Sequence, residues 1–224
     1  MIAFKLLAAV IGLTIQSLHA QEPIPSPTPS RSSVQFINAT SVQFINLEIK
    51  DFHLYTKLKP GAKISGGHFD FTTWKLKATS EMDESAFVEK SLLKTPNTSS
   101  TVVLVGNFQW LLDENGKKLK LQADILNFDH ELANDKNPNV LTIVNGITDK
   151  IIRVSVNESE FKEIYPMSHK TWYGLPDVSE AKAIHGKQTI RLPVKYKGDL
   201  NSGIVAFFEL NGEINYAAMP QTSF

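Results

Sequence analysis

The stretch "SVQFINATSVQFINLEI", residues 33–49, contains the hexamer Ser-Val-Gln-Phe-Ile-Asn twice. Val34 and Phe36 have the two-residue spacing that places side chains on one face of a β-strand. The polar residues that begin at Asn38 are typical of a turn. Alternation of apolar and polar residues then resumes over 45–49. The stretch therefore predicts a strand, a turn that starts at an asparagine, and a second strand.

A second stretch, "VLTIVNGITDKIIRVSV", residues 140–156, repeats this layout 107 positions downstream. Apolar residues lie nine and eleven positions after Asn145, just as they do after Asn38. The hexamer itself does not recur there. The unit that the two halves share is thus strand, asparagine turn, strand, and we interpret the doubled hexamer as incidental.

The correspondence extends further along both halves. Apolar runs at 101–106 and 203–208 are each followed by an Asn-Gly pair, at 115–116 and 211–212. Asn-Gly between alternating runs is the strongest short-range signal of a β-hairpin, because both residues tolerate a positive φ. A repeat of about 100 residues built from short strands indicates two β-sandwiches in tandem.

The predicted fold class is therefore all-β, with two tandem immunoglobulin-like, antiparallel β-sandwich domains at 33–132 and 139–224. A polar segment with Pro138 separates them. One helix is expected at most. The segment 81–93 has acidic residues early and a lysine late, which suits the dipole of a short surface helix.

The first 20 residues have the pattern of a secretory signal peptide, with Lys5 before an apolar run and a small residue, Ala20, before a polar segment. Residues 21–32 alternate Pro with Ser and Thr, which predicts an extended tether. The apolar run is shorter than the roughly 20 residues that span a bilayer, so no transmembrane segment is expected after cleavage. The expected location is the periplasm, the cell surface or the medium.

Composition narrows the function classes. The chain has no cysteine, which excludes disulfides, thiol catalysis and a lipoprotein anchor. Its 23 basic and 23 acidic side chains balance. Nucleic-acid binding needs a basic stripe, so nucleic acid is not an expected partner.

The segments "VQFINATS", "LKPGAKISGG" and "TVVLVG" resemble an uncharacterised family of exported bacterial β-sandwich repeats, a domain of unknown function. Copies in that family open with a V-x-F-x-N-A-S strand and end on a YTVVLVG-like strand. The first half is similar over most of its length, and the second half is similar more weakly. The resemblance implies a β-sandwich and an envelope or secreted location, and it implies no catalytic residues.

No nucleophile elbow, phosphate-binding loop, zinc-protease motif or calcium loop is present in the sequence. The adjacent acidic pairs at 83–84 and 113–114 lie in polar turns, where such residues usually serve as solvated side chains. No catalytic residue, metal site or cofactor is predicted.

Aromatic residues give the one speculative ligand-binding prediction: Trp172 and Tyr173, next to each other, and Trp74. Trp74 has the opposite parity from Phe69 and Phe71, which suggests exposure. Flat aromatic faces on a β-sandwich stack on sugar rings. The alternative is that these residues fill the core, since aromatic side chains dominate burial in small sandwiches.

The sequence thus predicts a non-catalytic exported binding or structural module, with a cell-wall or extracellular polysaccharide, or an envelope protein, as partner. Two alternatives remain at this stage. One is a periplasmic assembly chaperone that lends a strand to its client, for which 189–198 is the candidate strand. The other is a hydrolase with a carboxylate pair on its loops.

Overall fold

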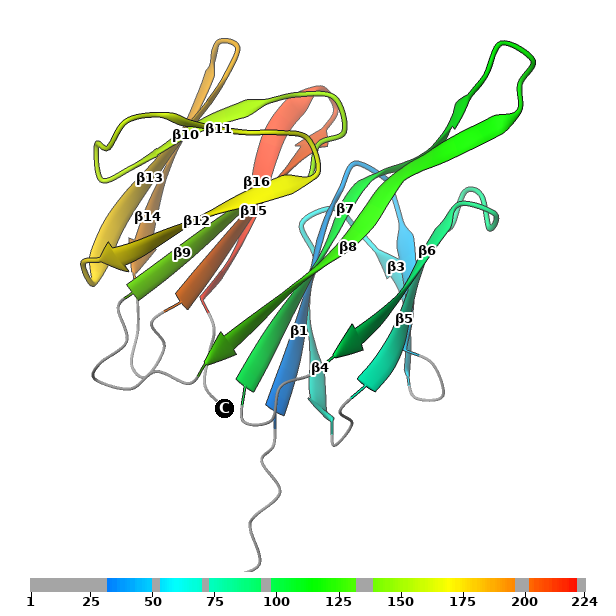
Figure 1. Ribbon diagram of the computed structural model, residues 1–224, viewed down its shortest axis with the longest axis horizontal. Coiled ribbons are helices and arrows are strands. Elements are labelled where there is room, and N and C mark those ends of the chain that lie inside the picture. Colours follow the sequence, from blue (N-terminus) through cyan, green and yellow to red (C-terminus); the bar gives the residue numbers. More distant parts are fainter. Residues whose placement is uncertain are drawn as a thin grey trace, which may run out of the picture.

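The computed structural model describes residues 32–49, 53–69, 73–93, 98–131, 139–195 and 202–220. These ranges form sixteen β-strands and contain no helix, so the all-β prediction is confirmed (Figure 1). The strands of the first half are β1 (Ser32–Thr40), β2 (Ile45–Ile49), β3 (His53–Leu58), β4 (Lys63–Phe69), β5 (Thr73–Ser80), β6 (Phe87–Leu93), β7 (Thr98–Leu112) and β8 (Lys118–Glu131). Those of the second half are β9 (Asn139–Asn145), β10 (Ile152–Val156), β11 (Lys162–Ile164), β12 (Ser168–Leu175), β13 (Val178–His185), β14 (Gln188–Lys195), β15 (Ser202–Leu210) and β16 (Glu213–Pro220).

The strands form four sheets of four, two in each half. The first half has an outer sheet, β3-β2-β5-β6, and an inner sheet, β4-β1-β7-β8. The second half has an outer sheet, β11-β10-β13-β14, and an inner sheet, β12-β9-β15-β16. Replacing each strand of the first half by the strand eight places later reproduces the order of the second, so the predicted repeat of two sandwiches is confirmed. Pairing is antiparallel except that β1 with β7, and β9 with β15, run parallel.

The repeated asparagine has the same role in both sandwiches. The Asn38 side-chain oxygen accepts the amide of Thr40 (3.1 Å), and its Nδ2 donates to the Leu58 carbonyl (2.8 Å). Asn145 accepts the amide two residues ahead (3.1 Å) and donates to two carbonyls (2.7 and 3.0 Å). Both asparagines are buried. Each one therefore ties the turn after the first strand to the loops beside it.

The two copies of the hexamer adopt different structures. The first copy lies wholly in β1, whereas the second begins in the bends after β1 and reaches β2 only at its last two residues. Identical residues differ here because the first copy pairs with two neighbouring strands. The interpretation of the hexamer as incidental agrees with this.

Each sandwich encloses a core between its two sheets. In β5 the buried Trp74, Leu76 and Ala78 alternate with more exposed residues, as expected for a strand with one face in solvent. The core of the first sandwich comprises Val34, Phe36, Ile45, Leu47, Ile49, Trp74, Leu76, Ala78, Ala86, Leu92, Val102, Leu104, Phe108 and Ile125. That of the second comprises Leu141, Ile143, Ile147, Ile152, Val154, Val156, Ile164, Trp172, Ala181, Ala183, Leu192, Val205, Phe207 and Ile214.

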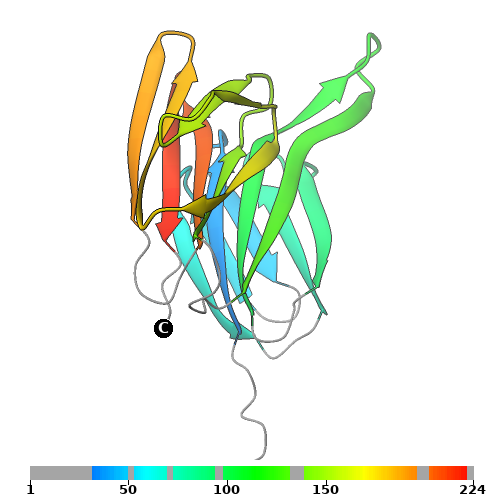
Figure 2. The same cartoon turned by 60° about the vertical axis from the view of Figure 1, so that its left-hand side comes forward.

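A third core joins the two sandwiches through their inner sheets. Ile37 pairs with Val103 in the first inner sheet, and Val144 pairs with Ala206 at the equivalent places of the second. Both pairs are buried in this shared cluster, which comprises Ile37, Ala39, Val103, Val105, Val144, Ile204, Ala206, Phe208 and Ala217. The inner strands are thus buried on both faces, and the molecule is a stack of four sheets (Figures 1 and 2).

The backbones of the two sandwiches meet at Gly146, which we call the seam. The Gly106 amide donates to the Gly146 carbonyl (2.8 Å). A Cβ on Gly146 would lie 2.2 Å from the Ala39 carbonyl oxygen and 2.8 Å from that of Phe207, so no larger residue fits. Away from the seam, the ring centroids of Phe128 and His169 lie 4.9 Å apart in an edge-on contact between the sandwiches.

The expected surface helix at 81–93 is wrong. Residues 81–86 form bends and a turn, and 87–93 form β6, which pairs with β5 from Thr79↔Phe87 to Thr73↔Leu93. Asp83 accepts the amide of Ser85 (2.9 Å) inside that turn. The acidic residues therefore stabilise a turn, and pairing with β5 overrides the weak helical pattern.

Both Asn-Gly pairs lie in hairpins, as predicted. Asn211 and Gly212 have φ of 53° and 80° and connect β15 to β16 as a two-residue turn. The loop at 113–117 is longer, and there Gly116 has a φ of 78°. The Asp113 side chain accepts two backbone amides of that loop (2.9 and 2.7 Å).

The close backbone contact at Gly146 can be tested by whether substitution with alanine raises or lowers the free energy of unfolding. Gly146 is not in the left-handed region of φ. At such a position Gly→Ala ordinarily raises the free energy of unfolding by about 0.4–1 kcal/mol. Because its Cβ would overlap backbone of both sandwiches, we expect Gly146→Ala to lower the free energy of unfolding by about 1–3 kcal/mol, measured by urea denaturation. A stability equal to or above the parent would contradict the seam.

The asparagine turns give a second prediction. Asn145→Ala leaves the carbonyls of Lys150 and Ile164 without this donor, and we expect a loss of about 2–3 kcal/mol in the same measurement. The matched control is Asn115→Ala on an exposed loop, expected within about 0.5 kcal/mol of the parent. Equal effects of the two substitutions would contradict the assigned role.

Candidate functional site

Two of the three aromatic residues predicted to bind ligand are buried. Trp74 is 6% exposed and Trp172 is 7% exposed. The Trp74 ring meets the Phe36 ring edge-on at 6.0 Å in the first core. The expected exposure of Trp74 is wrong, because β4 ends at Phe69 and β5 begins at Thr73, so alternation restarts between them.

Tyr173 differs from its neighbour, with 70% of its surface exposed. Consecutive residues of a strand point to opposite faces, so Tyr173 points away from the core that holds Trp172. Trp74 lies in the other sandwich. The structure therefore does not bring the three side chains together, and of the three Tyr173 has the accessible ring.

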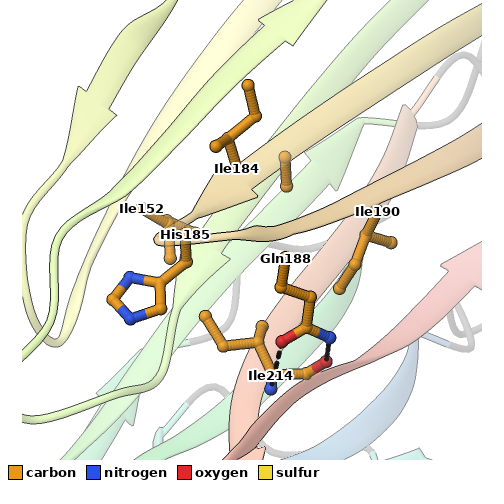
Figure 3. A pocket seen from close by; sticks show the side chains of 7 residues that line it. Ile152, Ile184, His185, Gln188, Ile190 and Ile214 are labelled. Carbon is orange, nitrogen blue, oxygen red and sulfur yellow. Dashed lines mark hydrogen bonds between the residues drawn. The ribbon is translucent and has the colours of Figure 1, made fainter.

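A small apolar cavity between β10, β13, β14 and β16 is shown in Figure 3. Its room is about 10 Å³, about the space of a single water molecule. Beside it the Gln188 side chain donates to the Ile214 carbonyl (2.7 Å) and accepts the Ile214 amide (2.9 Å), the pair of dashed lines in Figure 3. Gln188 thus links the two sheets of the second sandwich by two hydrogen bonds. The cavity is too small for a ligand.

The main difference between the sandwiches is an extension of one hairpin. β7 and β8 continue past the end of β1, and residues 107–122 project as a two-stranded arm (Figures 1 and 2). The equivalent strands β15 and β16 instead end at the tight turn. Three leucines of the arm are exposed: Leu111, Leu112 and Leu119.

The backbone at the base of the arm is unusual. Gly106 has a φ of 102°, and a Cβ there would lie 2.3 Å from the Gln122 carbonyl oxygen. Phe108 has a φ of 52° although it is bulky and buried, and such residues are true conformational outliers. The register between β7 and β8 breaks between Gly106 and Trp110. Residues that the surrounding structure keeps in sparsely populated regions of φ and ψ cluster at functional sites.

A hollow of about 590 Å³ lies at this base, between the arm and the turns that follow β1 and β5. Its volume is in the range of small-molecule sites. Its lining combines apolar, hydroxyl and amide groups, namely Ser41, Val42, Gln43, Ser80, Met82, Asp83, Asn107, Phe108, Gln109, Trp110, Leu112 and Lys118. Phe108 and Trp110 also contact the core of the first sandwich, so the hollow opens over the end of that core.

A hydrogen-bonded chain links the arm to the opposite wall of the hollow. The Lys118 ammonium donates to the Ser85 hydroxyl, and that hydroxyl donates to Asp83 (2.7 Å). These bonds from the Ser85 hydroxyl and amide lower the pKa of the Asp83 carboxyl below its usual value. Lys118 also lies 5.1 Å from the centre of the Trp110 ring. The hollow therefore carries one cation and one anion, and no net charge.

The second sandwich has two charged residues at the positions that correspond to Gln43, on the lining of the hollow, and to Gly106, at the base of the arm. Counting from the repeated asparagines and strand registers, Gln43 corresponds to Lys150, and Gly106 corresponds to Glu209. Lys150 and Glu209 form a salt bridge, less than a third exposed on both sides. The end of the first sandwich that carries the hollow thus differs in charge from the corresponding end of the second.

Sequence reasoning missed the arm, although a signal was present. Asn115 lies nine residues after the end of the apolar run at 101–106, whereas Asn211 lies three residues after 203–208. If the two hairpins had strands of equal length, the distance from the apolar run to the Asn-Gly pair would be the same in both. The difference marks an insertion in the first hairpin.

The described residues hold no group of three or more histidine, cysteine, aspartate or glutamate side chains placed to bind a metal. Asp83 and Asp113 accept hydrogen bonds within their own turns, so both have structural roles. Within the described ranges, no helix has the length and apolar character needed to cross a membrane.

No protein-family model matches this chain, and no curated protein matches it either. The resemblance to exported β-sandwich repeats stays a prediction.

The two adjacent aromatic residues of β12 give a prediction that separates core from surface. Trp172→Ala empties part of the second core, and we expect it to cost about 3–5 kcal/mol of unfolding free energy. Tyr173→Ala removes an exposed ring and should stay within about 0.5 kcal/mol of the parent. Urea denaturation measures both. A neutral effect of Trp172→Ala would contradict its place in the core.

Proposed function

We propose that this chain is an exported, non-catalytic binding module of the cell envelope or extracellular space, with a polysaccharide as its ligand. The observation that carries the proposal is the hollow of the first sandwich. Its lining places amide and hydroxyl groups next to apolar surface, and a sugar ring presents that same mixture of hydroxyl groups and C–H faces. The signal-peptide pattern supports export.

The shared core between the sandwiches limits where a ligand can bind. Because the inner sheets are buried against each other, their faces are unavailable to a ligand. The outer faces and the turns at the strand ends are left for recognition. Loops at the end of a rigid scaffold are where binding residues usually lie.

The hydrolase alternative is less well supported. Glycoside hydrolysis uses two carboxylates that flank the scissile bond. Asp83 is the one carboxylate in the lining of the hollow, and it is hydrogen-bonded to Ser85 and, through that residue, linked to Lys118. The hollow thus lacks the pair of acids that this chemistry needs.

The chaperone alternative concerned the strand at 189–198. Its described part belongs to β14, which pairs with β13 and forms an edge of the second outer sheet. Pro193 lies within it and cannot donate a backbone hydrogen bond. Prolines and charged residues on an edge disfavour pairing with another strand, which argues against strand exchange there.

Co-sedimentation of residues 21–224 with peptidoglycan and a panel of insoluble polysaccharides tests the proposal. We expect saturable binding to at least one polysaccharide, retained at 1 M salt because the hollow has no net charge. Unfolded protein is the control for non-specific adsorption. Absence of saturable binding to every polysaccharide would contradict the proposed ligand class.

A further inference from the structure

We infer that the hollow at the base of the arm is the binding site for a neutral sugar unit of the ligand, and that Tyr173 is not. This inference rests on the proposed function for the class of ligand. Beyond that class, the inference names the surface that binds the polysaccharide and states that the bound sugar unit carries no charge.

The hollow has an apolar floor and a rim built from several segments. Its floor is formed by side chains that also pack on the first core, Val42, Phe108 and Trp110. Its rim is formed by residues of three separate segments, the turn after β1, the turn after β5 and the base of the arm. An apolar floor with a few convergent polar groups is the usual build of a ligand site.

The polar groups match a ligand rich in hydroxyls. Gln43, Asn107 and Gln109 each provide an amide, which donates and accepts hydrogen bonds in the same way as a sugar hydroxyl does. Two of them are already oriented, since the Asn107 side chain accepts the amide of Gln109 (3.1 Å) and contacts the Gln109 and Gln122 side chains (3.4 Å each). Amides held in place in this way lose less entropy on binding.

Charge favours a neutral sugar over an acidic or basic one. Lys118 and Asp83 are joined through Ser85, so each already has a partner. A charged ligand group would have to compete with that bonded chain. A neutral ring leaves the chain intact.

Another depression, of about 240 Å³, lies on the outer face of the first outer sheet and supports no such inference. It is lined by Glu48, Lys75, Lys77 and Glu89, and Lys75 and Glu89 lie 3.8 Å apart as a surface ion pair. Alternating charges without an apolar floor are typical of a solvated sheet face.

Filling the hollow tests the inference. Gln43 is exposed on the rim, so Gln43→Trp places an indole in the opening without removing a core contact. We expect at least a tenfold loss of affinity for the neutral polysaccharide identified by co-sedimentation. Gln109→Ala, which removes one exposed amide, should cost about threefold to tenfold. Urea denaturation checks that both variants fold as the parent does.

The matched control is Lys187→Trp, because Lys187 is an exposed residue at the tip of the β13–β14 hairpin in the second sandwich. Tyr173→Ala is the second control. Both should bind as the parent does. Retained binding by Gln43→Trp, or a tenfold loss in Tyr173→Ala, would overturn the assignment to the hollow while the proposed function survives. Binding confined to charged polysaccharides and abolished by salt would overturn the neutral ligand. Absence of any binding by the parent would overturn the proposed function itself.

Discussion

The face-to-face packing of the two inner sheets is the constraint on which the rest of the structure depends. It buries β1, β7, β9 and β15 on both faces and brings the backbones so close that glycine is required at position 146. Equivalent positions of the two repeats contribute to this contact, as in a symmetric dimer whose subunits have been joined in one chain. A core-like contact of this kind fixes the sandwiches as one block and leaves their ends and outer faces for function.

The two sandwiches share one architecture and differ locally at one end. Both sandwiches keep the buried asparagine turn, the sheet order and the parallel pair of inner strands. At one end the second sandwich closes with a two-residue turn and the Lys150–Glu209 salt bridge. The first sandwich has a longer hairpin, and Gln43 and Gly106 in place of the ion pair. The two sandwich ends thus differ in hairpin length and in the residues at these two positions.

Much of the architecture could be predicted from local pattern. Period-two alternation, the spacing after Asn38 and Asn145, and the Asn-Gly pairs predicted two sandwiches and their hairpins, because these signals depend on neighbours in sequence. The helix expected at 81–93 failed because Phe87–Leu93 pairs with β5, and that partner lies outside the segment whose charge pattern indicated a helix. Trp74 was expected in solvent because parity was counted across two strands, which is valid only within one.

The sequence by itself determined the strands that flank the repeated asparagines, the repeat and the hairpin turns, because hydrophobic period and turn chemistry act over a few residues. One further signal lay in it: the unbroken apolar runs at 101–106 and 203–208 indicate strands buried on both faces. What the second face packs against was decided only by the tertiary structure, as was the hollow, whose lining comes from three segments distant in sequence. Convergence of that kind depends on how the sheets stack, and no local pattern contains it.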